Sequence, residues 1–137
     1  MSKQELIKGL NADLNNEIAA SLRYLLEASL MWGLAGHEAR EVFQEEVADE
    51  MKHAALLADK IVALGGTPSI NPELPTPIKD AKKALQRELE YERKAVANYI
   101  ERCKQADECG EVALRIELEN LIADETHHAE VIERLMG

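Results

Sequence analysis

The sequence has few aromatic residues, few glycines and little positive charge, and each shortage excludes a class of protein. Aromatic residues make up 4% of the 137 positions and there are seven glycines, which argues against a sheet-rich fold. Lysine and arginine number 16 against 26 acidic residues, and the resulting formal charge of -10 repels nucleic acid and anionic membranes. Hydrophobic residues still reach 46%, enough to build a buried core. We therefore expect one all-α domain over residues 1–137 that binds no nucleic acid.

Long hydrophobic runs and a cysteine framework are also missing. The most apolar stretch, residues 18–36, is interrupted by Arg23 and Glu27, so no run of about 18 apolar residues is present to cross a bilayer. The first ten residues lack the basic start, apolar block and cleavage site of a secretion signal. Cys103 and Cys109 would lie about 240° apart around one helix, which predicts two reduced thiols. These features predict a cytoplasmic protein without membrane partners.

Glycines and prolines divide the chain into four long segments of helical periodicity. Ser2 can cap the first helix, with Glu5 completing a capping box, and Pro77 suits the first position of the third. The expected helices run from Ser2 to Gly33 or Gly36, from His37 to Leu64, from Pro77 to Cys109, and from Glu111 to Met136.

The linker over residues 67–76 contains three prolines and cannot be helical. About 12 extended residues reach ~40 Å, which is the length of a 29-residue helix, so the chain can return along the whole bundle. The loop lengths thus predict a four-helix bundle of two antiparallel hairpins joined by a long crossover.

An internal repeat relates the two hairpins. The heptapeptides at residues 48–54 and 123–129 share five of seven residues and lie 75 positions apart. The same shift places Glu17 on Glu92 and Tyr24 on Tyr99. Two copies of one hairpin packed about a pseudo-two-fold axis would bring equivalent positions face to face at the centre of the bundle.

The repeat carries two Glu-x-x-His pairs, Glu50 with His53 and Glu125 with His128. Residues three apart lie on one helix face about 5–6 Å apart, so each pair can chelate one metal ion. Glu50 lies in a seven-residue ladder that is otherwise apolar, and Glu17 and Glu92 occupy equivalent ladders. A buried carboxylate in such a ladder costs several kcal/mol unless a cation neutralises it.

Together these residues predict a dinuclear metal site at mid-bundle. Glu17 precedes Glu50 by 33 residues, and Glu92 precedes Glu125 by the same number, so all the ligands fall at one level along the bundle. The expected ligands are four carboxylates and two imidazoles: Glu17, Glu50, His53, Glu92, Glu125 and His128. Such a set suits iron, with manganese as the second choice, better than zinc. The alternative is a helical interaction module in which these residues form salt bridges.

Other polar residues can support this site. Asp49 and Asp124 can each accept a hydrogen bond from the histidine of the other motif, which fixes its tautomer. Tyr24 and Tyr99 stand one heptad beyond Glu17 and Glu92 and can hydrogen-bond a carboxylate. Residues expected to be surface or packing positions are Trp32, His37, Met51, Cys103 and His127.

These residues and their spacing resemble the di-iron carboxylate proteins of the ferritin-like superfamily, and bacterioferritins most closely. The resemblance covers nearly the whole chain. It implies terminal ligands at Glu17 and Glu92, bridging ligands at Glu50 and Glu125, and oxidation of Fe(II) with oxygen or peroxide for iron storage or detoxification. It also implies a homo-oligomer, an electron donor, and haem ligation at Met51, for which this single methionine is the only sign.

The sequence departs from related families in three ways. It ends nine residues after His128, without the short fifth helix that helps ferritins build hollow shells. A rubrerythrin-type peroxidase would carry another glutamate three residues after Glu92, where this chain has Ala95, and would add a Cys-x-x-Cys module. Peroxidase or oxygenase activity is therefore the second expectation.

Overall fold

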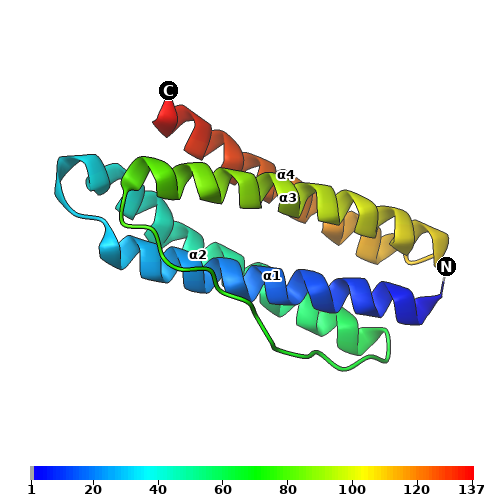
Figure 1. The fold of residues 1–137 in the computed structure, drawn as a ribbon. Helices are drawn as coiled ribbons and strands as arrows, with labels where there is room; N and C mark the ends of the chain where they lie inside the picture. Colours follow the sequence, from blue (N-terminus) through cyan, green and yellow to red (C-terminus); the bar gives the residue numbers. More distant parts are fainter. Residues whose placement is uncertain (1) are drawn as a thin grey trace.

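The computed structural model describes residues 2–137, and these form four helices and no strand. The helices are α1 (Lys3–Leu30), α2 (Gly33–Ala63), α3 (Ala81–Glu108) and α4 (Val112–Met136). Figure 1 shows them as two antiparallel hairpins, α1 with α2 and α3 with α4, with the chain termini at opposite ends of the bundle. This confirms the predicted four-helix bundle. None of the helices in the described part of the chain has the length and hydropathy needed to cross a bilayer.

The crossover runs along α1, from the end of α2 to the start of α3 (Figure 1). Two asparagines of α1 fasten it. Asn11 accepts a hydrogen bond from the Ser69 backbone at 2.9 Å, and Asn15 donates to the Ser69 carbonyl at 2.8 Å. These two hydrogen bonds hold the crossover against α1, the helix that carries Glu17.

Three expected helix boundaries were wrong. The first helix ends at Leu30, before the glycines, because the chain turns at Met31. The second helix begins at Gly33, four residues earlier than expected, and Gly33 adopts a φ of 72° that only glycine takes without strain. The third helix begins at Ala81 and not at Pro77, because Asp80 caps it by accepting a hydrogen bond from the Lys83 amide at 2.9 Å.

Removing the Asp80 cap should therefore destabilise the protein. Asp80→Ala is expected to cost about 1 kcal/mol and to lower Tm by about 3–5 °C. Thermal unfolding followed by circular dichroism measures this change. Asp80→Asn is the matched control, since asparagine caps equally well and should leave Tm nearly unchanged. Equal losses in both variants would mean that the cap is not responsible.

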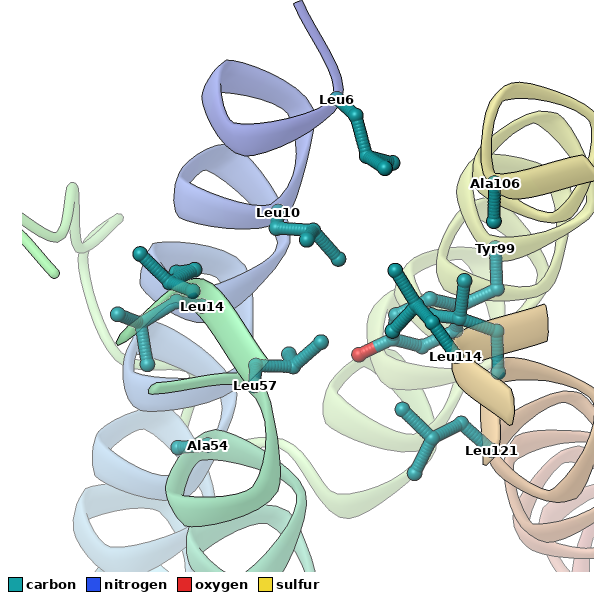
Figure 2. Close-up of a cluster of buried hydrophobic side chains, with 11 residues drawn as sticks. Leu6, Leu10, Leu14, Ala54, Leu57, Tyr99, Ala106, Leu114 and Leu121 are labelled. Atoms are coloured by element: carbon teal, nitrogen blue, oxygen red, sulfur yellow. The ribbon is translucent and has the colours of Figure 1, made fainter. Parts of the chain in front are cut away.

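Two apolar clusters fill the bundle, one toward each end. One joins leucines from α1, α2 and α4 with Tyr99 and Ala106 of α3, and Figure 2 shows Leu10, Leu57 and Leu114 pointing toward one another between the hairpins. The other is built around Tyr24 and Phe43, whose ring centroids lie 5.5 Å apart. Polar residues occupy the level between the two clusters.

Two buried ion pairs join α1 to α3 on either side of that level. Arg102 donates to Asp13 at 2.8 Å, and Arg23 donates to Glu88 at 2.6 Å. Burial raises the pKa of Asp13 to about 6, with Arg102 opposing the shift. Each pair holds the two hairpins together.

Candidate metal centre

The six side chains singled out by the repeat meet at the middle of the bundle. Each is at most 6% exposed. Every helix contributes: Glu17 from α1, Glu50 and His53 from α2, Glu92 from α3, and Glu125 and His128 from α4. The structure therefore brings together, in a buried position, all of the residues that the spacing pointed to.

Carboxylate oxygens surround the Nδ1 atom of each histidine. The Nδ1 atom of His53 lies 3.0 Å from Oε1 of Glu125, 3.5 Å from Oε2 of Glu17 and 3.8 Å from Oε1 of Glu50. The Nδ1 atom of His128 lies 3.1 Å from Oε1 of Glu50, 3.3 Å from Oε1 of Glu125 and 3.7 Å from Oε2 of Glu92. Glu50 and Glu125 thus face both histidines, whereas Glu17 and Glu92 each face one.

The unpaired polar atoms fit a pair of metal ions. Seven buried nitrogen or oxygen atoms that face this centre make no hydrogen bond to any of residues 2–137: Glu17 Oε2, Glu46 Oε2, Glu50 Oε1, His53 Nδ1, Glu92 Oε2, Glu125 Oε1 and His128 Nδ1. Two ligand atoms about 2.1 Å from one ion and at right angles lie ~3 Å apart, which is close to the spacing here. So many carboxylate oxygens around two histidines are costly to bury, and bound cations would satisfy them better than the two imidazoles can.

Two tyrosines hold Glu92 and Glu17 across the hairpins. The hydroxyl of Tyr24 donates to Oε1 of Glu92, and the hydroxyl of Tyr99 donates to Oε1 of Glu17, both at 2.5 Å. Burial raises the pKa of both tyrosines well above the usual value, and the adjacent glutamates raise it further, so both hydroxyls remain donors. Each bond leaves the other oxygen of its glutamate, Oε2, facing the centre.

Two aspartates contact the outer nitrogens of the histidines. Nε2 of His53 lies 3.1 Å from Oδ2 of Asp124, and Nε2 of His128 lies 3.5 Å from Oδ2 of Asp49. Each aspartate comes from the motif of the opposite hairpin. A proton held on Nε2 by the aspartate leaves the Nδ1 lone pair for a cation.

Sequence reasoning missed one buried residue of this cluster, Glu46. Its side chain lies on α2 one turn before Glu50, is 6% exposed, and places Oε2 at 2.7 Å from Nδ1 of His128. The signal was available, because residues four apart share a helix face. Glu46 was overlooked because the equivalent position in the repeat is Leu121.

The remaining candidates lie away from the centre. His127 is exposed, as expected for the residue beside His128. Trp32 is 85% exposed and Met51 is 45% exposed. His37 forms an exposed group with Glu38 and Glu41 at the start of α2, with no contact to the buried centre.

When no ion is bound, burial and the neighbouring charges shift the pKa values of the glutamates and histidines in the centre. Burial raises the pKa of Glu50 well above its usual range, and Glu17 adds to the effect. Burial also raises the pKa of Glu92 to about 8, although His128 opposes the shift. Burial alone would lower the pKa of His53, but Glu125 and Glu17 outweigh it and raise it to about 10. In the metal-free protein, protons bound to Glu50, Glu92 and His53 therefore offset the negative charge that metal ions would otherwise neutralise.

The metal-free protein should consequently lose stability as the pH rises from 5 to 9. Between pH 4.5 and about 8, folded Glu92 keeps a proton that the unfolded chain has lost; between pH 6.5 and about 10, His53 does the same. A state that binds more protons is disfavoured by rising pH, so both groups act in one direction. Glu125 has a lowered pKa, and its contribution changes only below pH 4.5.

Thermal unfolding of the metal-free protein at intervals across this range tests the pH dependence. Tm should fall steadily, and Glu92→Gln should flatten the decline below pH 8. With Mn(II) present the trend should reverse, because ions compete with protons for the same atoms. A metal-free Tm that rises between pH 6 and 9 would contradict these pKa directions.

A cavity of about 560 Å³ leads to the centre between α1, α3 and the crossover. Four of the glutamates reach its floor: Glu17, Glu50, Glu92 and Glu125. Its walls carry small and amide side chains such as Ala19 and Asn98, together with the charged side chains of Arg23, Glu73 and Lys94. The histidines do not line the cavity, so the centre is approached from its carboxylate side.

Comparison with known proteins gives a consistent set of relatives. The family described as "Ferritin-like domain" matches residues 7–137. A bacterial ferritin of Synechocystis is 30% identical and covers 98% of this chain and 88% of its own length. Other relatives are bacterioferritins.

Solved structures extend the likeness to the whole fold. A ferritin-like, diiron-carboxylate protein of Bacillus anthracis is 36% identical with a TM-score of 0.94, and the match covers 100% of both chains. A dodecameric thioferritin of Bacteroides fragilis, described as bacterioferritin-related, is 25% identical with a TM-score of 0.88 over 99% of this chain and 86% of its own.

Proposed function

The chain belongs to the ferritin-like family, and on this premise we propose that it is a di-iron ferroxidase, which oxidises Fe(II) with oxygen or peroxide for iron storage or detoxification. The observation that carries the proposal is the group of seven buried, unpaired nitrogen and oxygen atoms gathered around two histidines. The ferritin-like relatives support the same reading.

Each residue has a role in this proposal that follows from its contacts. Glu50 and Glu125 face both histidines and would bridge the ions, whereas Glu17 and Glu92 would each hold one. His53 and His128 would each offer Nδ1 to one ion. Bound iron supplies one-electron redox chemistry at each position. The carboxylate-rich set favours iron, with manganese as the alternative ion.

The protein around the centre would orient the ligands and control access. The tyrosines fix the carboxylates of Glu17 and Glu92, and Asp124 fixes the ring of His53. The apolar clusters keep bulk water from the ligands on both sides. Fe(II) and the oxidant would enter through the cavity between α1 and α3.

We extend the proposal to a homo-oligomer, which the dodecameric Bacteroides fragilis relative supports. We further propose that the protein works in the cytoplasm, with Cys103 and Cys109 as thiols that are not joined to each other. The proposal includes no haem, for which this chain offers the half-exposed Met51 as a single candidate ligand.

Aerobic addition of Fe(II) to the metal-free protein tests the function. About two Fe(II) per chain should oxidise in a fast phase, and further additions should accumulate as ferric mineral. Rapid turnover of hydrogen peroxide with a reductant, without mineral, would instead indicate the peroxidase alternative. Light scattering measures the size of the particle. Failure to retain any iron would reject the proposal.

A further inference from the structure

Glu46 makes the two halves of the centre different. Glu46 is 6% exposed, and its Oε2 has no hydrogen bond of good geometry within residues 2–137; Nδ1 of His128, at 2.7 Å, forms an ion pair with it. A buried carboxylate needs a proton donor or a cation to offset the cost of burial, and this one is directed toward a single histidine. The observation points to a ligand on the His128 side.

The repeat supplies an internal reference for this position. Glu17 corresponds to Glu92 and His53 corresponds to His128, but the residue that corresponds to Glu46 is Leu121. Leu121 is 3% exposed and packs in the apolar cluster that contains Tyr99. By the repeat, the position that carries a carboxylate in the hairpin of Glu46 carries hydrocarbon in the other hairpin.

Ion binding would leave Glu46 without any other partner. Once Nδ1 of His128 holds a cation, it carries no proton to donate to Glu46. Nε2 of the same ring is turned toward Asp49. The 2.7 Å between Glu46 Oε2 and His128 Nδ1 is close to the ~3 Å expected for neighbouring ligand atoms on one ion.

We propose that Glu46 is an additional carboxylate ligand for the ion beside His128 alone, so that the two metal positions are unequal. This inference rests on the proposed dinuclear centre. The position beside His128 receives one more negative ligand, and it fills first and binds more tightly. The position beside His53 has one protein ligand fewer, and it is the one that exchanges its ion more readily.

Titration of the metal-free protein with Co(II), followed by its visible absorption and by calorimetry, tests the inference. The wild type should bind two Co(II) in two resolved steps. Glu46→Leu, which copies Leu121, should still bind two but weaken the first step by about tenfold or more, so that the steps merge. Glu46→Gln should give the same result with less change of shape.

The controls separate ligation from a structural role. Glu45→Gln removes an exposed neighbour and should titrate like the wild type. Metal-free Glu46→Leu should unfold at a Tm no lower than the metal-free wild type, because a buried acid has been removed, and its Tm should gain less from Co(II). A lowered metal-free Tm with an unchanged titration would assign Glu46 a structural role and overturn the inference.

The outcomes also distinguish this inference from the proposed function. Two Co(II) bound identically by the wild type and by both Glu46 variants would overturn the inequality and leave the dinuclear centre standing. A single unresolved step in the wild type would do the same. No Co(II) bound by the wild type would overturn the centre itself, and the inference with it.

Discussion

Metal binding should raise the Tm of this protein by more than any single substitution lowers it. Free ion at a thousand times its Kd stabilises the folded state by ~4 kcal/mol per site, which is about 12–20 °C for a chain of this size. The gain should be large because the ion relieves repulsion among four buried glutamates at most 3% exposed. Calorimetry of the metal-free protein with and without Mn(II) measures it.

Chelation provides the reverse control for this effect. Excess EDTA should return Tm to its metal-free value and leave the helical circular dichroism intact, since both apolar clusters lie outside the centre. Ca(II), which prefers six to eight oxygen ligands, should give a much smaller gain. Equal gains from Ca(II) and Mn(II) would indicate binding to surface acids.

Glu50→Ala should remove at least one metal ion from the centre. Glu50 Oε1 faces both histidines, at 3.1 Å from His128 and 3.8 Å from His53. Loss of an outer partner of a ligand typically costs 10–100-fold, so loss of a bridging carboxylate should lower the rate of Fe(II) oxidation by at least about 100-fold. Bound metal should fall from two ions per chain to one or none.

The helices should survive this substitution, because the buried carboxyl group of Glu50 destabilises the metal-free fold. Burial raises its pKa, and Glu17 adds to the effect. Glu45→Ala removes an exposed glutamate from the same helix and should change neither metal content nor rate. Two ions retained at full occupancy by Glu50→Ala would contradict its bridging role.

The overall fold was predictable because its signals are local and redundant. Proline positions in residues 67–76 exclude a helix, and the length of that segment fixes the crossover. Helix starts were less predictable, since two chemical devices compete there. Pro77 suits a first helical position, but the Asp80 side chain accepts a hydrogen bond from the amide of Lys83. The helix therefore begins at Ala81, directly after this cap.

The location of the central residues followed from the internal repeat, which relates Glu17 to Glu92 and His53 to His128. The same repeat hid Glu46. A comparison of the two hairpins cannot reveal a glutamate that is present in only one of them. Only the structure shows that Oε2 of Glu46 lies 2.7 Å from Nδ1 of His128. The cavity could not be predicted from the sequence either, because side chains of α1, α3 and the crossover form it together.

Crystals of the protein loaded with Fe(II) without oxygen, measured on both sides of the iron absorption edge, test the central claim most directly. We expect two anomalous peaks per chain between Glu50 and Glu125, about 3.5–4 Å apart, one beside each histidine. Absence of any peak at mid-bundle, or iron held only by exposed acids such as Glu38 and Glu41, would contradict the account.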